Sequence, residues 1–379
     1  MRIPILLTTS TLFILVLAWK SIEHPAPGGF VVAQKIEGGE EPIYQASFAS
    51  NKVTSEVHSA GAVELKNGNI RAVWYGGTRE GHADVAIYTN IWNASSKQWG
   101  QEQAIVDLAT TREDTKRYAR KLGNPVVTRS SDGSLWLFYV SAVGGWATSS
   151  INLSISEDEG QTWGKAKRLI SSPALNFSTL VKGKPIHFTD GTIGLPVYHE
   201  FLAKYGELLR LDKSGNVIDK TRLAWGRDSL QPVIMPYSEQ EAVSMLRYAG
   251  KAPNRILTQF SSNAGLSWPE PIKTTLPNPN AAITGISVNG GGRLLMVFND
   301  HPEERDKLSL AFSDNQGQSW KTIHVFESWK ENWKEKKQGY SYPSLIQTTN
   351  GDFHLVYSWN IQKIKHVRFN QAWLESKIP

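Results

Sequence analysis

The sequence predicts an all-β fold, a six-bladed β-propeller, preceded by a short N-terminal export segment. Three observations support this prediction. Short apolar and aromatic runs alternate with turn residues, convincing helical periodicity is nearly absent, and one motif recurs with a period near 52 residues. Because a repeat of about 50 residues is the length of a four-stranded blade, six blades fill residues 30–379 as one domain.

The composition excludes several classes of protein. The chain of 379 residues has no Cys, which excludes disulfides, zinc-thiolate sites, iron–sulfur clusters and a cysteine nucleophile. Its formal net charge is +6 and its basic residues are scattered, so we expect no nucleic-acid partner. The 14 Trp residues suit β-structure and a carbohydrate-facing surface.

The N-terminus has the pattern of a secretory signal or a signal anchor. Met1 and Arg2 give a positive start, an apolar run follows to Trp19, and Lys20 closes it. We assign residues 1–22 to a signal peptide or a membrane anchor and residues 23–29 to a linker. The expected location is therefore periplasmic or extracellular, with the protein either secreted or tethered to a membrane.

The clearest strands each follow a turn in which Gly is paired with Asp or Asn, the residues that hairpin turns favour. These strands are expected at residues 70–75, 134–140, 192–198, 292–298 and 352–359. Short loop helices are expected over 110–121 and 325–337. A strand near residues 30–36 is expected to pair with the last blade and so to close the propeller.

The recurring motif combines Ser, Asp or Asn, Gly, Ser or Thr, and a final Trp. Strict copies lie at 156–163, 261–268 and 313–320, and degenerate copies are expected near 89–99, 210–215 and 368–373. The Asp or Asn side chain can accept hydrogen bonds from the turn backbone, Gly supplies a positive φ, and Trp packs the hairpin into the core. Every copy would play the same role wherever the single ligand site lies, so we interpret the motif as structural.

These copies resemble the Asp-box (BNR) repeats of the sialidase superfamily. Outside the repeats, residues 76–84 (GGTREGHAD) are similar to a segment of bacterial BNR-repeat neuraminidases. Further similar segments lie at 123–125, 182–186, 195–200, 230–232, 277–280 and 340–343. The resemblance implies an exo-acting, sialidase-like glycoside hydrolase that releases a terminal sialic-acid-like sugar.

Three arginines from different blades are candidates for holding the carboxylate of such a sugar: Arg79, Arg247 and Arg305. A guanidinium offers a planar fork that stays charged and matches a carboxylate in two hydrogen bonds. Classical sialidases take their first arginine from an R-I-P segment, which occurs here only at residues 2–4, inside the export segment. Arg79 is the candidate to replace the family's first arginine, and the sequence does not decide whether it does so.

The resemblance also implies a tyrosine nucleophile with a glutamate partner and an aspartate acid/base, in contrast to the two carboxylates of most glycosidases. In chain order, the matching residues are Asp84, Glu200 and either Tyr340 or Tyr342, which the sequence does not separate. Six further residues are weaker candidates for lining the pocket: His58, Glu80, Tyr198, Gln231, Asn278 and Asn280.

Two other functions remain open at this point. One is a uronate-directed hydrolase or lyase, since an arginine-lined pocket also suits a uronate carboxylate. The other is a non-catalytic glycan-binding propeller. The pair His199-Glu200 is not followed by the second His of a zinc motif, so we expect no metal and no cofactor. The expected partner is a glycan whose terminal sugar bears a carboxylate, without a protein partner.

Overall fold

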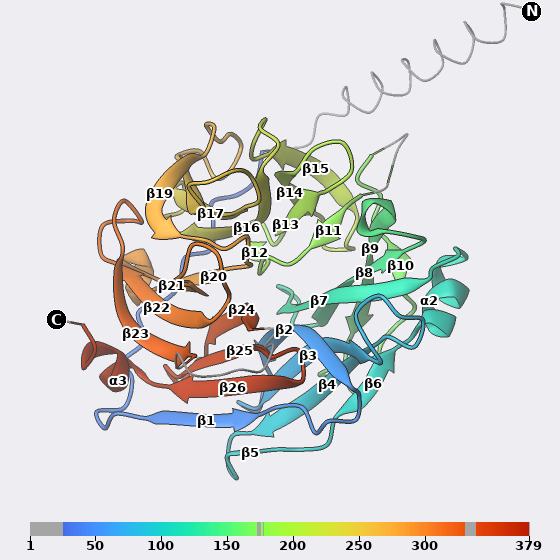
Figure 1. Cartoon of the computed structure of the whole chain (residues 1–379), viewed down its shortest axis with the longest axis horizontal. Coiled ribbons are helices and arrows are strands. Elements are labelled where there is room, and N and C mark those ends of the chain that lie inside the picture. Colours follow the sequence, from blue (N-terminus) through green and yellow to red (C-terminus); the bar gives the residue numbers. More distant parts are fainter. Residues whose placement is uncertain (1–25, 173–175, 177, 330–338, 379) are drawn as a thin grey trace, which may run out of the picture.

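The computed structural model describes residues 26–172, 176, 178–329 and 339–378 and contains six antiparallel sheets arranged around a central channel (Figure 1). The predicted six-bladed β-propeller is confirmed. The expected export segment, residues 1–22, lies outside the described residues. In the part of the chain that the structure describes, no helix has the length and apolar character needed to cross a membrane.

Blades 1 to 3 follow one another along the first half of the chain. Blade 1 contains β2 (Glu56–Glu64), β3 (Ile70–Gly77), β4 (Ala86–Asn93), β5 (Gln98–Trp99) and β6 (Gln103–Val106). Blade 2 contains β7 (Lys121–Arg129), β8 (Leu135–Ala142), β9 (Ser149–Ser156) and β10 (Lys167–Arg168). Blade 3 contains β11 (Leu180–Val181), β12 (Ile186–His187), β13 (Ile193–His199), β14 (Tyr205–Leu211) and β15 (Val217–Arg222).

Blades 4 to 6 complete the ring. Blade 4 contains β16 (Ser229–Pro236), β17 (Ala242–Tyr248), β18 (Arg255–Ser261) and β19 (Ile272–Pro277). Blade 5 contains β20 (Thr284–Val288), β21 (Arg293–Asn299), β22 (Lys307–Ser313) and β23 (Lys321–Ser328). Blade 6 contains β24 (Tyr340–Gln347), β25 (Phe353–Trp359), β26 (Lys363–Phe369) and β1 (Tyr44–Phe48). The five expected strands are β3, β8, β13, β21 and β25, the second strand of five different blades.

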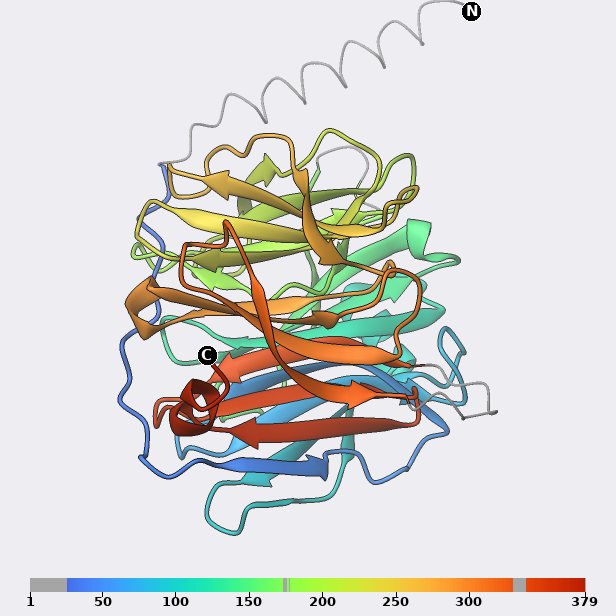
Figure 2. The same ribbon diagram turned by 60° about the vertical axis from the view of Figure 1, so that its left-hand side comes forward.

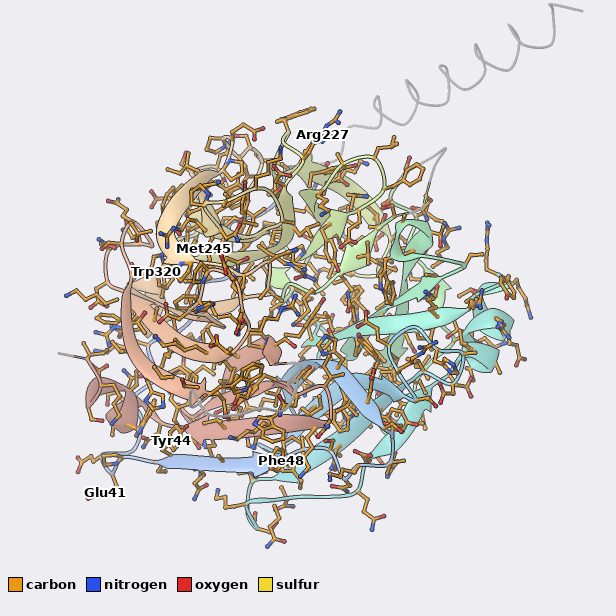
Figure 3. The ribbon with its side chains drawn as sticks, in the orientation of Figure 1. Glu41, Tyr44, Phe48, Arg227, Met245 and Trp320 are labelled. Atoms are coloured by element: carbon orange, nitrogen blue, oxygen red, sulfur yellow. The ribbon has the colours of Figure 1, made fainter. Side chains whose placement is uncertain are left out.

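The propeller closes through β1, which pairs antiparallel with β26 along its whole length, from Tyr44 opposite Phe369 to Phe48 opposite Lys365. Figure 3 shows Tyr44 and Phe48 on this outer strand. The prediction that residues 30–36 form the closing strand is wrong. Phe30 instead bridges to Phe188 of blade 3, where its fully buried ring has apolar neighbours. From there the chain runs along one end of the propeller to reach blade 6 (Figure 2).

The helical predictions were half right. Helix α2 (Leu108–Thr115) begins at Asp107, whose carboxylate caps the backbone N–H of Thr110 at 2.8 Å, and it overlaps the expected segment 110–121. Residues 325–328, expected to be helical, are the end of β23, and 330–337 lie outside the described residues. A second α-helix among the described residues, α3 (Gln371–Glu375), is not predicted by the sequence, and two 3-10 turns, η1 (Trp146–Thr148) and η2 (Asn289–Gly291), occur in loops.

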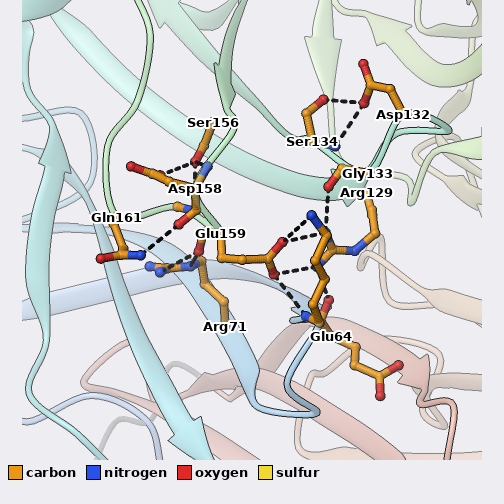
Figure 4. A network of polar contacts seen from close by, with 12 residues as sticks. Glu64, Arg71, Arg129, Asp132, Gly133, Ser134, Ser156, Asp158, Glu159 and Gln161 are labelled. Carbon is orange, nitrogen blue, oxygen red and sulfur yellow. Dashed lines mark hydrogen bonds and ion pairs between the residues drawn. The ribbon is translucent and has the colours of Figure 1, made fainter.

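The Asp boxes have the structural role expected of them (Figure 4). Each strict copy joins the third strand of its blade to the fourth, in blades 2, 4 and 5. In blade 2, Ser156 Oγ accepts from the N–H of Gly160 at 2.7 Å, and Asp158 Oδ1 accepts from the N–H of Thr162 at 2.9 Å. The same turn holds the neighbouring blade, because the carbonyl of Glu159 accepts from Arg71 of β3.

The two ends of the channel are formed by different loops. Because successive strands are antiparallel, the Asp boxes lie at the end of the blades opposite to the loops that join second and third strands. We call the first end the Asp-box face and the second the mouth face. Each innermost strand begins at the mouth face.

Candidate active site

A positive φ occurs once per blade at the start of the innermost strand. The six residues, in blade order, are Ser59 (φ 56°), Asn124 (44°), Ser178 (60°), Gln231 (47°), Asn280 (52°) and Tyr342 (54°). In four of the blades the strand pairing shifts register at this point, as a β-bulge requires. Bulges redirect side chains and are common beside active sites. These six positions place the candidate site at the mouth of the channel.

A chain of hydrogen bonds connects blades 2 to 4 around this mouth. The hydroxyl oxygen of Tyr198 accepts from Asn124 Nδ2 at 3.1 Å and from Gln231 Nε2 at 3.2 Å. Gln231 Oε1 accepts in turn from Arg247 Nη1 at 3.1 Å. Since Tyr198, Asn124 and Gln231 are buried, the chain fixes Arg247 with little freedom.

Arg247 and Arg305 are both anchored on Asn280. Arg247 Nε donates to Asn280 Oδ1 at 2.7 Å, and Arg305 Nη2 donates to the Asn280 carbonyl at 2.8 Å. Burial lowers the pKa of Arg305, and the positive charge of Arg247 lowers it further. Among the described residues neither guanidinium forms an ion pair with a carboxylate. Two adjacent cations without an anionic partner are a site for an anion.

Tyr342 lies at the centre of the site. Its ring contacts the ring of His58, with centroids 4.4 Å apart, and Lys182 Nζ lies 5.8 Å from its centroid. Lys182 Nζ also donates to the carbonyl of Pro343 at 3.2 Å. Burial lowers the pKa of Lys182 to about 8, and burial together with Arg305 lowers that of His58 to about 3. His58 is therefore neutral at ordinary pH, and Lys182 supplies a positive charge beside the Tyr342 ring.

Glu80 comes from the loop after β3 and reaches the same region. Although the residue keeps solvent-exposed surface, the protein around its carboxyl group raises the pKa, and the charge of Glu56 adds to this effect. Hydrogen bonds from Tyr75 and Trp146 and the charge of Arg305 oppose the rise. Glu80 therefore keeps its proton to higher pH than a glutamic acid with an unshifted pKa, as a general acid requires.

Glu200 follows β13 directly at the mouth face. Its backbone N–H donates to Ser178 Oγ at 3.0 Å. Burial raises the pKa of Tyr198, and the charges of Tyr342 and Glu200 raise it further. Glu200 thus lies near enough to Tyr198 to affect its ionisation.

Four of the predicted site residues lie elsewhere or bond differently. Asp84 is exposed and accepts from the N–H and hydroxyl of Thr78 at 2.9 and 2.6 Å, and these bonds lower its pKa. The exposed side chain of Arg79 forms no hydrogen bond or ion pair with a described residue. Tyr340 is buried, and Asn278, which is also buried, fastens a turn through Ala281 and Tyr248.

The structure adds residues that the sequence did not single out individually. Lys182 and Asn124 lie in segments that the family resemblance covers. No sequence pattern indicated Tyr75 or Trp146 as site residues. Trp146 is placed by Gly123, where a Cβ would lie 2.8 Å from the indole ring. Asn124, Gln231 and Tyr342 could have been found from the sequence, because each is followed by a proline. A proline inside a strand indicates a bulge.

Comparisons with known proteins agree with this architecture. The family model described as the BNR repeat-like domain matches residues 68–355. The Hadza microbial sialidase Hz136 superposes with a TM-score of 0.70 at 14% identity, covering 86% of this chain and 68% of its own. NanB sialidase from Streptococcus pneumoniae gives 0.66 at 9% identity, covering 92% and 71%. An α-L-arabinanase from Penicillium chrysogenum gives 0.60 at 13% identity, covering 87% and 97%. No curated protein matched the sequence.

Proposed function

The chain belongs to the family of BNR repeat-like domains, and on that premise we propose that it is an exo-acting glycoside hydrolase that releases a terminal, carboxylate-bearing sugar of the sialic acid type. The observation that supports this proposal most directly is the anchoring of Arg247 and Arg305 on Asn280. Sialidases and an arabinanase share the fold, so the substrate class rests on the site of this chain.

An acidic sugar fits the electrostatics of the mouth. Arg247, Arg305 and Lys182 give three positive charges, and the charges of all three act on His58. A bound carboxylate offsets the repulsion between the two guanidiniums and accepts from their forks. Arg79 does not join Arg247 and Arg305. The third positive charge of the site is instead the ammonium of Lys182.

Tyr342 is the nucleophile in this proposal, with Glu200 as the group that takes its proton. An anomeric carbon that bears a carboxylate repels an anionic nucleophile, whereas a neutral phenol approaches without that cost. The ammonium of Lys182 stabilises the phenolate as the proton leaves. The phenol oxygen bonds to the anomeric carbon while the bond to the leaving oxygen breaks, and water later releases the sugar.

Glu80 serves as the acid that protonates the leaving oxygen. Its raised pKa favours the protonated form, whereas the lowered pKa of Asp84 favours the carboxylate. Asp84, which the family resemblance implies as the acid/base, instead closes the loop that carries Glu80. Glu80 and Asp84 thus receive different roles because their surroundings shift their pKa values in opposite directions.

A uronate-directed enzyme is the second candidate. The specific observation in its favour is that two guanidiniums, not three, meet at Asn280. A uronic acid carboxylate needs no third arginine. In a lyase, Tyr342 would abstract a proton next to the carboxylate instead of attacking the anomeric carbon.

The test is turnover by the purified full chain on two matched panels of 4-methylumbelliferyl glycosides, one of nonulosonic acids and one of uronic acids. Release from the first panel, lost in Tyr342→Phe, is the expected result. Release from uronides alone, or an unsaturated product absorbing near 235 nm from a polyuronate, replaces the proposal with the second candidate. Binding without turnover on both panels leaves a non-catalytic glycan-binding propeller.

A further inference from the structure

The loops that follow β13 and β15 hold an exposed aromatic platform on the mouth face of the propeller. The exposed ring of this platform is Trp225, at 73%, in the loop after β15, and the loop after β13 carries Phe201 and Leu202, which are 55% and 82% exposed. Both loops lie on the mouth face, because one joins the second and third strands of blade 3 and the other leads into blade 4. Figure 3 shows Arg227, two residues after Trp225, at the outer edge of the propeller.

A series of face contacts holds this tryptophan in place. The ring of His199 stacks on that of Tyr205 at 4.5 Å with a 22° angle. The Arg222 guanidinium lies 3.8 Å from the centroid of Tyr205 and 4.5 Å from that of Trp225. At the inner end, His199 Nε2 bonds Glu207 Oε2 at 2.8 Å. The rings are thus ordered before any ligand arrives, which reduces the entropic cost of binding.

The backbone around the platform is also fixed. The N–H of Trp225 donates to Glu270 Oε1 at 2.6 Å, and Arg222 Nε donates to the Ala224 carbonyl at 2.8 Å. The two loops pair through a bridge between Lys204 and Asp228. A residue this exposed, on a backbone this restrained, presents one indole face to solvent while Arg222 covers the other.

We propose that Trp225 is a second sugar-binding subsite, which stacks on a pyranose ring of the substrate chain away from the bond that is cut. The apolar C–H face of a pyranose fits the flat indole face that Arg222 leaves open to solvent. His199, where the stack begins, immediately precedes Glu200. One loop therefore links the platform to Glu200 of the site, and this inference rests on the proposed function.

A glycan suits the platform better than a protein or a membrane. The rim carries Lys204, Arg227 and Asp228, a mixture of charges unlike the uniformly basic edge of a membrane-binding surface. Three exposed apolar side chains are far fewer than the roughly 20–30 residues a side of a stable protein interface. One exposed aromatic face matches a single sugar ring.

The experiment compares a short and a long substrate with the same terminal sugar. For wild type, Trp225→Ala and Leu202→Ala, kcat and KM are measured with a 4-methylumbelliferyl sialoside and with a tetrameric oligosialic acid. We expect Trp225→Ala to raise KM about tenfold for the tetramer alone, as the loss of one stacking contact implies, and Leu202→Ala to change neither. Equal effects of Trp225→Ala on both substrates, or none, overturn the inference.

A binding measurement keeps the subsite testable if the proposed function fails. Saturation-transfer NMR of the full chain with oligosialic acid and with a galacturonic acid hexamer needs no turnover. Contact of internal rings that is lost in Trp225→Ala supports the subsite, and its absence in wild type with both probes overturns it. An equal loss in Leu202→Ala also overturns it, because a general apolar patch would then explain the binding.

Discussion

Tyr340 and Tyr342 lie two residues apart on β24, yet their side chains have different surroundings. Tyr342 contacts His58 and lies near Lys182 at the channel mouth. Tyr340 packs in the core between blades 5 and 6, where burial and the charge of Glu327 raise its pKa to about 12. In a regular strand both side chains would share one face. The bulge and the positive φ of Tyr342 separate them.

The first prediction follows from this separation. Tyr342→Phe removes the nucleophile and is expected to lower kcat on the order of 10³-fold or more, with little change in melting temperature. Tyr340→Phe removes a hydroxyl in the core and is expected to keep kcat while losing about 1 kcal/mol of stability. Steady-state kinetics and a melting curve on both variants provide the check. The opposite pattern would exchange their roles.

The second prediction concerns the arginines. Arg247→Ala and Arg305→Ala are each expected to lose about 2–5 kcal/mol of transition-state binding, because a substrate carboxylate is left without a charged partner. Lys at either position restores only part of kcat/KM, since an ammonium lacks the fork. Arg79→Ala, at an exposed position, is expected to stay near wild type. A large loss there would restore Arg79 as the third member of the clamp.

The third prediction compares two asparagines two residues apart. Asn280→Gly keeps the positive φ and the carbonyl that holds Arg305, but it removes the Oδ1 that holds Arg247. It is expected to lower kcat/KM about tenfold, the loss of one charged hydrogen bond. Asn278→Ala, in a buried turn, should instead lower stability by about 1–3 kcal/mol. Equal kinetic effects of both variants would contradict the anchoring role of Asn280.

The fourth prediction is a pH dependence. With Glu80 as the acid, kcat/KM falls as pH rises through its raised pKa, because the carboxylate cannot protonate the leaving oxygen. Glu80→Gln is expected to remove this limb and to slow poor leaving groups by about 10²–10⁴-fold, and 4-methylumbelliferyl substrates by much less. Lys182, whose pKa is lowered to about 8, gives a separate limb that remains. Asp84→Asn is the matched control, and an identical effect there would return the acid role to Asp84.

The fifth prediction concerns stability. Glu159, in the first Asp box, accepts from Arg129 Nη1 and Nη2 at 2.8 and 2.7 Å (Figure 4), and these bonds lower its pKa to about 2. Glu159→Gln is expected to cost about 1–3 kcal/mol at pH 7. A lowered carboxyl pKa stabilises the fold above the unfolded value of 4.5 and loses this effect as pH falls toward 2.

Denaturant unfolding at pH 7 and pH 3 measures this dependence. The difference between wild type and Glu159→Gln should shrink at pH 3. The neighbouring exposed Glu157→Gln should match wild type at both values. An undiminished difference at pH 3 would show that the side-chain ion pair is not the origin of the effect.

The sequence by itself determined the architecture and the blade-forming turns. The Asp-box copies at 156–163, 261–268 and 313–320 are local: Ser, Asp or Asn, and Gly bond within a few residues, so these copies identify three of the six blades without tertiary information, and their spacing gives the length of a blade. The Gly-containing turns placed β3, β8, β13, β21 and β25 for the same reason. Chain order also indicated Arg247, Arg305, Glu200 and Tyr342 as members of one site.

Only the tertiary structure decided which residues meet. Closure fell to residues 44–48 instead of 30–36, because pairing with β26 depends on where the chain arrives after Phe30 is buried against blade 3. The separation of Tyr342 from Tyr340, of Glu80 from Asp84, and of Lys182 from Arg79 depends on burial and on contacts between blades. Those contacts join residues far apart in the sequence, and local residue patterns do not specify the distances between them.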